Sequence, residues 1–179
     1  MPFGFFIILN MYGLFIVMSN KTKIVITGPA ASGKDYLKNV FANKGFLAGV
    51  LDTTRPIRKG EKDGVDYYFK SEENFDKSDY LFSYSYNNWW YGLRKGEWKN
   101  KDVFVLTPEY INMLHDKNIH NFVVIYLKIP FWARLFRLLK RNDVDSVFRR
   151  MNADRKQFKG FNKQNILINK FNINITKIL

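Results

Sequence analysis

Gly28-Pro29-Ala30-Ala31-Ser32-Gly33-Lys34-Asp35 is the stretch that decides the fold of this chain. An apolar run at residues 23–27 precedes it and predicts a buried strand, and apolar side chains on one helical face follow at residues 37–41. Strand, glycine-bounded loop and helix form the context of a phosphate-binding P-loop. In such a loop the backbone N–H groups and the positive end of the helix face the phosphates, and Lys34 reaches the outer ones.

The last position of the motif departs from the usual pattern, because Asp35 stands where Ser or Thr is expected. A hydroxyl at this position gives Mg²⁺ a neutral ligand, whereas a carboxylate is a harder and stronger oxygen ligand. We therefore predict that Asp35 binds Mg²⁺ directly or through a water molecule. Its negative charge beside the phosphates is tolerable only if the metal or the helix dipole offsets it.

The composition is that of an ordinary globular protein, since 46% of the 179 residues are hydrophobic and 25% are charged. The absence of cysteine excludes disulfides and thiolate metal sites, and we expect an intracellular, cytoplasmic protein. His115 and His120 are the only histidines, which disfavours a histidine-based metal site, and we interpret both as surface or capping residues. The net charge of +13 indicates anionic partners, either nucleotides or nucleic acid, although spread lysines can also serve solubility alone.

Residues 1–17 stand apart because they are strongly apolar and carry no charged side chain. They are slightly short for a membrane-spanning helix, and they lack the basic start and the small-residue cleavage site of a signal peptide. Our preferred hypothesis is that Met18 is the natural start and that residues 1–17 come from an over-extended reading frame. The alternative is a weak membrane anchor. On the preferred hypothesis the functional domain covers residues 18–179, and no membrane partner is expected.

Local patterns predict the remaining elements. Apolar runs predict strands at residues 46–51, 103–106, 121–128 and 166–169, and helical signals predict helices at residues 108–115, 130–140 and 146–158. Residues 71–82 indicate a helix followed by a strand, and residues 84–93 indicate an aromatic hairpin with its turn at Asn87-Asn88. Strands that alternate with helices predict a parallel sheet covered on both faces.

Residues 52–69 form a turn-rich segment that holds two arginines three positions apart. The rigid forks of Arg55 and Arg58 suit the oxygens of a phosphate monoester, and the hydroxyl of Tyr67 adds a donor. The alternative is a solvated basic loop. The pattern Thr53-Thr54-Arg55-Pro56-x-Arg58-x-Gly60-Glu61-x-x-Gly64-x-Asp66-Tyr67-x-Phe69 resembles the nucleoside-monophosphate-binding segment of guanylate kinases, with the P-loop upstream at the separation that this family shows. The resemblance implies that Arg55, Arg58 and Tyr67 hold the phosphate of the acceptor nucleotide.

The resemblance extends to the aromatic hairpin and to the C-terminal part of the chain. Tyr91-Gly92 matches the Tyr-Gly of the family, which implies that Tyr91 also contacts the acceptor phosphate. The helices on either side of residues 141–146 resemble the family's lid, whose arginines face the transferring phosphate. By position these are Arg137, Arg141 and Arg150, although the lid is slightly shorter here and Arg149 and Arg150 cannot be told apart.

The match weakens where guanylate kinases read the base. Leu51 and Leu93 stand where the family has hydroxyl side chains, and the acidic residue expected at about Phe82 or Ser83 is absent. The Leu-Asp-x-Asp motif is replaced within residues 103–108. Because guanine presents N–H donors for which a buried carboxylate is the natural acceptor, guanine specificity is not assured. Four residues stay open as substitutes: Asp52, Thr54, Glu97 and Thr107.

Together these features predict an α/β fold of the P-loop NTPase type, a three-layer sandwich with a parallel sheet. A small mixed NMP-binding subdomain is expected at residues 52–98 and a helical lid at residues 141–152. The resemblance implies an ATP-dependent nucleoside monophosphate kinase, most simply one for GMP or dGMP, with Mg²⁺ as its cofactor. ATP is expected at the whole loop Gly28–Asp35, and the catalytic residues implied are Lys34, Arg137, Arg141 and Arg150.

Two other functions stay open. One is a (d)NMP kinase of another base specificity. The other is a non-catalytic interaction module of the kind found in membrane-associated scaffolds, although those modules typically lose the P-loop lysine and this chain keeps Lys34. No nucleic-acid partner is expected, because a nucleic-acid kinase would not explain the acceptor motif. We expect a monomer or a homodimer.

Overall fold

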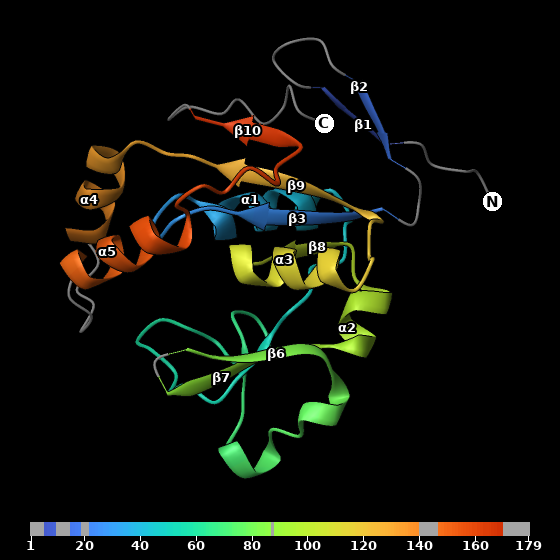
Figure 1. The fold of residues 1–179 in the computed structure, drawn as a ribbon, viewed down its shortest axis with the longest axis vertical. Helices are drawn as coiled ribbons and strands as arrows, with labels where there is room; N and C mark the ends of the chain where they lie inside the picture. Colours follow the sequence, from blue (N-terminus) through green and yellow to red (C-terminus); the bar gives the residue numbers. More distant parts are fainter. Residues whose placement is uncertain (1–5, 10–14, 19–21, 87, 140–146, 170–179) are drawn as a thin grey trace. The chain divides into compact units, whose positions relative to one another are not determined.

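The computed structural model describes residues 6–9, 15–18, 22–86, 88–139 and 147–169 (Figure 1). The chain divides into two compact units. Unit 1 comprises Met1–Leu37 and Val105–Leu179, and unit 2 comprises Lys38–Phe104.

A four-stranded sheet with the order β10-β9-β3-β8 is the centre of unit 1. Its strands are β3 (Lys23–Thr27), β8 (Val103–Val105, where the chain returns to unit 1), β9 (Phe122–Leu127) and β10 (Ile166–Ile168). β9 is parallel to both of its neighbours, with Val124 opposite Val25 and Ile125 opposite Ile166. Every residue of β3 and β9 is buried, as is typical of strands inside a parallel sheet.

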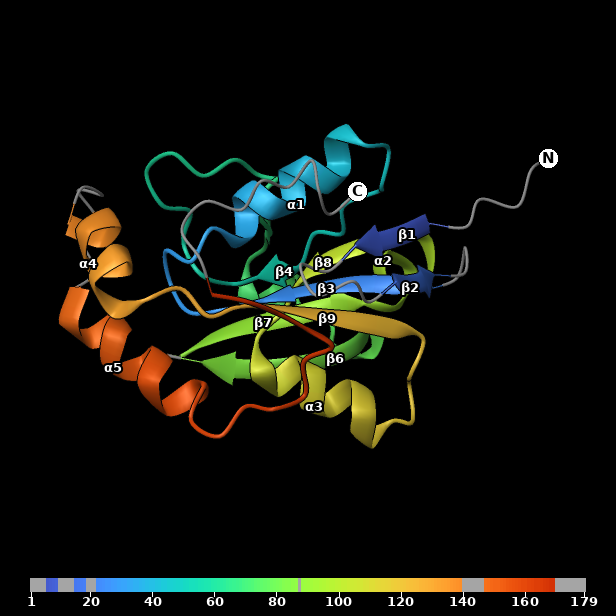
Figure 2. The same ribbon diagram turned by 90° about the horizontal axis from the view of Figure 1, so that it is seen from above.

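Helices cover both faces of this sheet. α1 (Lys34–Asn43), whose first turn belongs to unit 1, lies on one face, and α3 (Pro108–Asp116) lies on the other (Figure 2). α4 (Phe131–Leu139) follows β9, and α5 (Val147–Gln157) precedes β10. The predicted α/β fold with its parallel sheet is confirmed. The strands predicted at residues 103–106, 121–128 and 166–169 and the helices predicted at residues 108–115, 130–140 and 146–158 are confirmed to within one residue at each end.

The N-terminal segment contains two short strands. β1 (Phe6–Leu9) pairs antiparallel with β2 (Phe15–Met18), with Phe6 opposite Met18. Within the described ranges, no helix combines the length and the apolar character that crossing a bilayer requires. A natural start at Met18 stays a prediction.

Unit 2 is built on a mixed sheet with the order β5-β4-β7-β6. Its strands are β4 (Asp52–Thr53), β5 (Tyr68–Phe69), β6 (Tyr80–Tyr86) and β7 (Trp89–Arg94). β4 is parallel to β5 and antiparallel to β7, and β6 pairs antiparallel with β7, which confirms the aromatic hairpin. Asn87, half of the predicted turn, lies outside the described residues. α2 (Lys95–Asn100) follows the hairpin and was not predicted.

The predicted strand at residues 46–51 is wrong. In this run only Ala48 makes an isolated bridge, to Val103. The backbone of Gly49 packs so closely on the ring of Phe104 that a Cβ would clash there, and the N–H of Val50 donates to a side chain instead of a strand. Residues 49–51 are buried but Leu47 is 54% exposed, and the backbone hydrogen bonds of Leu47 and Gly49 to Val103 do not extend into a strand.

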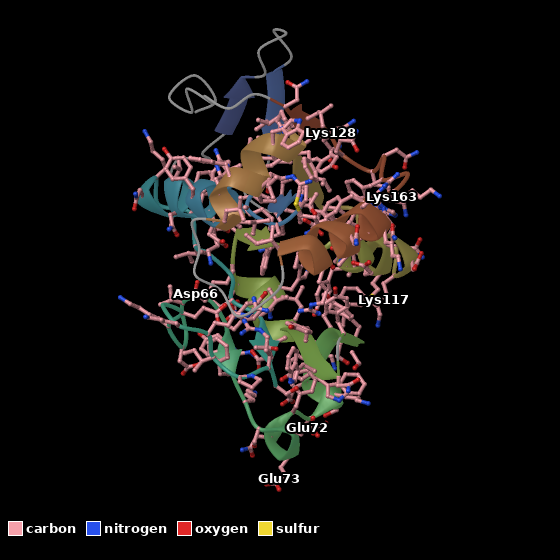
Figure 3. The ribbon with its side chains drawn as sticks, turned by 90° about the vertical axis from the view of Figure 1, so that its left-hand side faces the viewer. Asp66, Glu72, Glu73, Lys117, Lys128 and Lys163 are labelled. Carbon is pink, nitrogen blue, oxygen red and sulfur yellow. The ribbon has the colours of Figure 1, made fainter. Side chains whose placement is uncertain are left out.

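The predicted helix after residue 71 is also wrong, because two 3₁₀ turns stand in its place, at Glu72–Asn74 and Lys77–Asp79. Phe75 caps the end of the first turn, and Asp76 caps the start of the second, since its Oδ1 accepts a hydrogen bond from the N–H of Ser78 at 2.8 Å. Such local bonds compete with the helical ladder. Glu72 and Glu73 are exposed on the first turn (Figure 3).

Candidate functional site

We define the P-loop site of unit 1 as residues 28–35 together with Arg134, Arg137 and Asp154. Its loop joins the end of β3 to the start of α1. Gly28 is required here because a Cβ would lie 2.7 Å from Ser32 Oγ and 2.8 Å from the backbone oxygen of Leu127. Ala31 has a φ of +57°, in the left-handed region, which costs a residue with a side chain about 1–2 kcal/mol. The contacts around the loop must offset this cost.

Lys34 and Asp35 occupy the first turn of α1. The ammonium group of Lys34 donates hydrogen bonds to the backbone oxygens of Gly28 at 2.8 Å and of Pro29 at 2.9 Å, so the loop itself holds the cation. The side chain of Asp35 is exposed, and a carboxylate in the first turn is favoured by the helix dipole. The structure thus places both residues at the loop, and their roles stay predictions.

Two arginines of α4 reach back to the loop. Arg137 Nη1 donates to the backbone oxygen of Ala31 at 3.0 Å, and Arg134 Nη1 lies 3.5 Å from that of Ala30. Arg134 Nη1 also pairs with Asp154 Oδ2 at 2.9 Å, and the same oxygen accepts the N–H of Ala30 at 2.9 Å. Burial raises the pKa of the Asp154 carboxyl, against the opposing effects of the Ala30 N–H and Arg134. Neither Arg134 nor Asp154 was predicted as a site residue.

Of the predicted lid arginines, the structure places Arg137 at the P-loop. Arg141 lies outside the described residues. Arg150 lies in α5, but its side chain is outside what the structure describes, so the choice between Arg149 and Arg150 is not decided.

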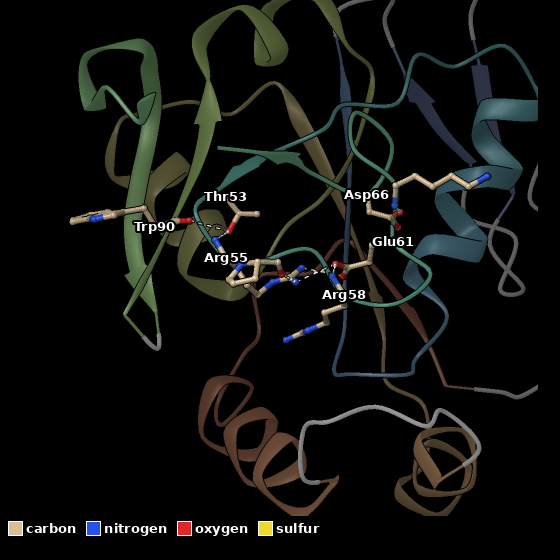
Figure 4. Close-up of polar contacts among 8 residues, drawn as sticks. Thr53, Arg55, Arg58, Glu61, Asp66 and Trp90 are labelled. Atoms are coloured by element: carbon tan, nitrogen blue, oxygen red, sulfur yellow. Dashed lines mark hydrogen bonds and ion pairs between the residues drawn. The ribbon is translucent and has the colours of Figure 1, made fainter. Parts of the chain in front are cut away.

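We define the Arg55 site of unit 2 as Arg55, Arg58, Glu61, Tyr67 and Tyr91. Figure 4 shows Arg55, Arg58 and Glu61 of this site. The buried guanidinium of Arg55 donates to Glu61 through two bonds, of 3.0 and 2.9 Å, and lies 5.4 Å from the ring centre of Tyr67. The rings of Tyr67 and Tyr91 meet edge to face, with their centres 6.0 Å apart. Glu61 also accepts the backbone N–H of Arg58 at 2.9 Å. The sequence pattern contains Glu61 but does not indicate its contacts with Arg55 and Arg58.

Two threonines attach this segment to β7 (Figure 4). Thr53 Oγ1 donates to the backbone oxygen of Trp90 at 3.0 Å and accepts the N–H of Arg55 at 3.2 Å. Thr54 Oγ1 accepts the N–H of Trp90 at 2.9 Å. The backbone that carries Arg55 is therefore fixed to the sheet.

Asp52, one of the four proposed base acceptors, is fully buried. Its carboxylate accepts the hydroxyl of Tyr80 at 2.9 Å and pairs with Lys70 at 2.8 Å and with Arg94 at 3.0 Å. Burial, together with this bond to a carboxylate, raises the pKa of the Tyr80 hydroxyl. A carboxylate with these partners and no exposed surface is a structural group of the sheet rather than a base acceptor.

The other proposed acceptors are placed differently. Thr54 is bonded to β7, and Glu97 accepts the N–H of Val50 at 3.0 Å, so both have structural partners in unit 2. Thr107 precedes α3 in unit 1, and its buried Oγ1 has no hydrogen-bond partner within the described part of the chain. The reading of the base therefore stays open.

His115 and His120 line a pocket of about 460 Å³ in unit 1, where their ring centres lie 5.8 Å apart. Burial, and secondarily the charge of Lys163 (labelled in Figure 3), lowers the pKa of His115. No cluster of three or more histidine, aspartate or glutamate side chains suited to a metal occurs in the described ranges.

Comparison with known proteins identifies the family of this chain. The family model described as guanylate kinase matches residues 20–174. A guanylate kinase of Mycoplasma genitalium is 35% identical over 149 residues, which is 75% of this chain and 62% of that protein. One of Wigglesworthia glossinidia brevipalpis is 30% identical over 181 residues, which is 90% of this chain and 86% of that protein.

A crystal structure of guanylate kinase from Anaplasma phagocytophilum resembles this fold with a TM-score of 0.62 at 19% identity, over 87% of this chain and 80% of that one. At that identity the likeness concerns the fold alone. The chain spans about three-fifths of the length of the relatives from Mycoplasma genitalium and Mycoplasma pneumoniae, 62% and 57%. Because the family model matches most of the sequence, the chain belongs to the guanylate kinase family.

Proposed function

We propose that this protein is an ATP-dependent nucleoside monophosphate kinase that transfers the γ-phosphoryl group of ATP to GMP or dGMP. The observation that carries the proposal is that each unit holds its own cationic site suited to phosphate. Unit 1 has the P-loop with Lys34 and Arg137 against its carbonyls, and unit 2 has Arg55 oriented by Glu61. Phosphoryl transfer needs such positioning and charge neutralisation rather than covalent chemistry.

The residues divide into three tasks. Lys34 and the loop amides hold the phosphates of ATP. The acceptor phosphate is held by Arg55, Arg58, Tyr67 and Tyr91. The charge of the transferring group is neutralised by Arg137, Arg141 and Arg150. Residues that close over the nucleotides also exclude water, which would otherwise hydrolyse ATP.

Mg²⁺ fits the P-loop site through its oxygen donors. Asp35 presents an exposed carboxylate in the first turn of α1, and the buried Oγ of Ser32 has no hydrogen-bond partner in the part of the chain that the structure describes. Mg²⁺ is usually held by one or two carboxylates together with substrate phosphates, so a single aspartate suffices. When bound, the ion neutralises charge on the outer phosphates of ATP.

The variant Asp35→Ser is expected to stay active, with kcat within about threefold of the parent, because a serine hydroxyl can replace the carboxylate as an oxygen ligand. The Mg²⁺ concentration for half-maximal rate is expected to rise, since the hydroxyl is the weaker ligand. Steady-state rates over a Mg²⁺ titration measure both. An inactive Asp35→Ser protein would mean that the aspartate has another task.

The variant Arg58→Ala is expected to raise the KM of the acceptor about 10–100-fold, because the lost guanidinium fork contacts a phosphate. The KM of ATP is expected to change little. Rates measured with each substrate varied in turn separate the two constants, and Lys59→Ala, an exposed neighbour of like charge, serves as the control. Equal changes in both KM values would remove Arg58 from the acceptor site.

One assay tests the proposed function itself: release of ADP in the presence of each NMP and dNMP in turn. GMP or dGMP should give the fastest release. Leu51 and Leu93 are buried apolar side chains where the resemblance calls for hydroxyls, and this favours a second candidate, a kinase for another base. That candidate is supported if another nucleotide is the better acceptor. If no acceptor stimulates ADP release, a non-catalytic interaction module is the better assignment.

We place the protein in the cytoplasm, where ATP and nucleoside monophosphates are available, as a monomer or homodimer without a nucleic-acid partner.

A further inference from the structure

Both polar backbone groups of Ala30 in the P-loop are held by a single ion pair. The N–H of Ala30 donates to Asp154 Oδ2 at 2.9 Å, and its carbonyl oxygen lies 3.5 Å from Arg134 Nη1. The same Nη1 pairs with Asp154 Oδ2 at 2.9 Å, and Arg134 Nε donates to the backbone oxygen of Ile129 at 3.2 Å. The pair thus connects α4, α5 and the loop.

The ion pair of Arg134 and Asp154 is largely buried. The side chains of Arg134 and Asp154 are only 11% and 13% exposed. Burial raises the pKa of Asp154, and the Ala30 N–H, Arg134 and the charge of Lys34 offset that effect only in part. A carboxyl whose pKa is higher in the folded than in the unfolded chain stabilises the fold at low pH and loses this contribution as the pH rises through the folded pKa. The contribution of this carboxyl to stability is therefore smaller at pH values above its folded pKa than at low pH.

The position of the pair along the loop indicates its task. Ala30 directly precedes Ala31, the residue in the left-handed conformation, and the carbonyl of Ala31 is held by Arg137. The strained residue is thus fixed on both sides, by the ion pair before it and by Arg137 at its own carbonyl. Without the ion pair the loop is free to relax toward less strained conformations.

We propose that Arg134 and Asp154 are positioning residues that keep the P-loop in the form that receives the polyphosphate of the donor nucleotide. The proposal rests on the function proposed above, because it takes ATP as the ligand of the loop. A loop that is already in its binding form needs no reorganisation when the phosphates arrive, and this preorganisation strengthens binding.

The variant Asp154→Ala is expected to weaken ADP binding, measured by calorimetry without an acceptor, about tenfold, because the N–H of Ala30 loses its acceptor. The KM of ATP should rise by a similar factor, whereas the KM of the acceptor should change by less than about twofold. Hydrogen exchange at the Ala30 amide of the nucleotide-free protein should become faster. Asp154→Asn keeps an oxygen that can accept this N–H and should fall between the parent and Asp154→Ala.

Gln157→Ala is the matched control. Gln157 also lies on α5, and its Nε2 donates to Glu109 Oε2 at 2.7 Å, so the change breaks a contact of α5 with α3 instead of the contact with the P-loop. Its ADP affinity should stay within about twofold of the parent.

Unchanged ADP affinity in Asp154→Ala would overturn the proposal. Tighter binding would also overturn it, because the carboxylate would then compete with phosphate. If Asp154→Ala does not fold, Asp154→Asn decides by the same criteria. A parent protein that binds no ADP or ATP would refute the proposed function, whereas a parent that binds and a variant that binds equally would refute only the positioning role.

Discussion

Replacing Lys34 with alanine is expected to lower kcat by at least about two orders of magnitude with every acceptor nucleotide, because the change removes a preorganised cation from the place where phosphate charge develops. The hydrogen bonds of 2.8 and 2.9 Å from Nζ to Gly28 and Pro29 show that the loop already holds this ammonium group. These carbonyls are neutral, so phosphate oxygens are stronger acceptors for the ammonium group when a nucleotide binds.

The measurement is ADP release at saturating ATP and acceptor, together with the melting temperature. Lys44→Ala is the control, because Lys44 is an exposed lysine directly after α1 and its loss removes the same charge. The control should keep full activity, and both variants should melt close to the parent. A Lys34→Ala protein that still turns over would refute the assigned role.

The P-loop could be predicted because its signals are local. A buried strand, two glycines and a helical face occur within about twenty consecutive residues, and each of them constrains the backbone on its own. The Arg55 site could be found for a similar reason, since Arg55, Arg58, Glu61 and Tyr67 lie within one turn-rich segment. The segment pattern located these residues, but it did not show that Glu61 binds Arg55.

The pair of Arg134 and Asp154 could not be predicted in the same way. Their contacts with Ala30 span 104 and 124 positions of sequence, and no local pattern encodes them. One signal was present, because Arg134 and Arg137 are three residues apart on a helix and so lie on one face. Nothing in the sequence indicated that this face meets the P-loop.

The apolar composition of residues 46–51 misled the prediction of a strand there. An apolar run is equally compatible with a strand and with buried irregular backbone. Here Leu47 and Gly49 bond to the backbone of Val103, but the pairing does not extend along the run, since Gly49 packs on the ring of Phe104 and Glu97 takes the N–H of Val50. The same limitation applies to Asp52, because its partners Lys70, Tyr80 and Arg94 lie on other segments of unit 2.

Replacing Arg137 with alanine is expected to lower kcat about a thousandfold, because an arginine that faces a transferring phosphoryl group is worth about 10³–10⁵ in rate. Arg137 Nη1 donates to the carbonyl of Ala31 at 3.0 Å, and a Cβ on Gly33 would lie 3.9 Å from the same nitrogen, so the guanidinium already lies over the loop. An interaction made only in the transition state lowers kcat and kcat/KM equally and leaves the KM of ATP nearly unchanged.

Three variants separate this role from simple support of the loop. Arg137→Lys keeps the charge but loses the planar fork, and it should recover only part of the lost rate. Arg155→Ala removes an exposed arginine of α5 and should leave kcat unchanged. The contrary outcome is that Arg137→Ala raises the KM of ATP with little change in kcat. In that case Arg137 contributes to the binding of ATP rather than to the transition state, and like Arg134 it is a residue that shapes the loop. Steady-state kinetics on these variants therefore distinguishes two roles of Arg137. In one it neutralises the charge of the transferring phosphoryl group, and in the other it holds Ala31 in its strained conformation.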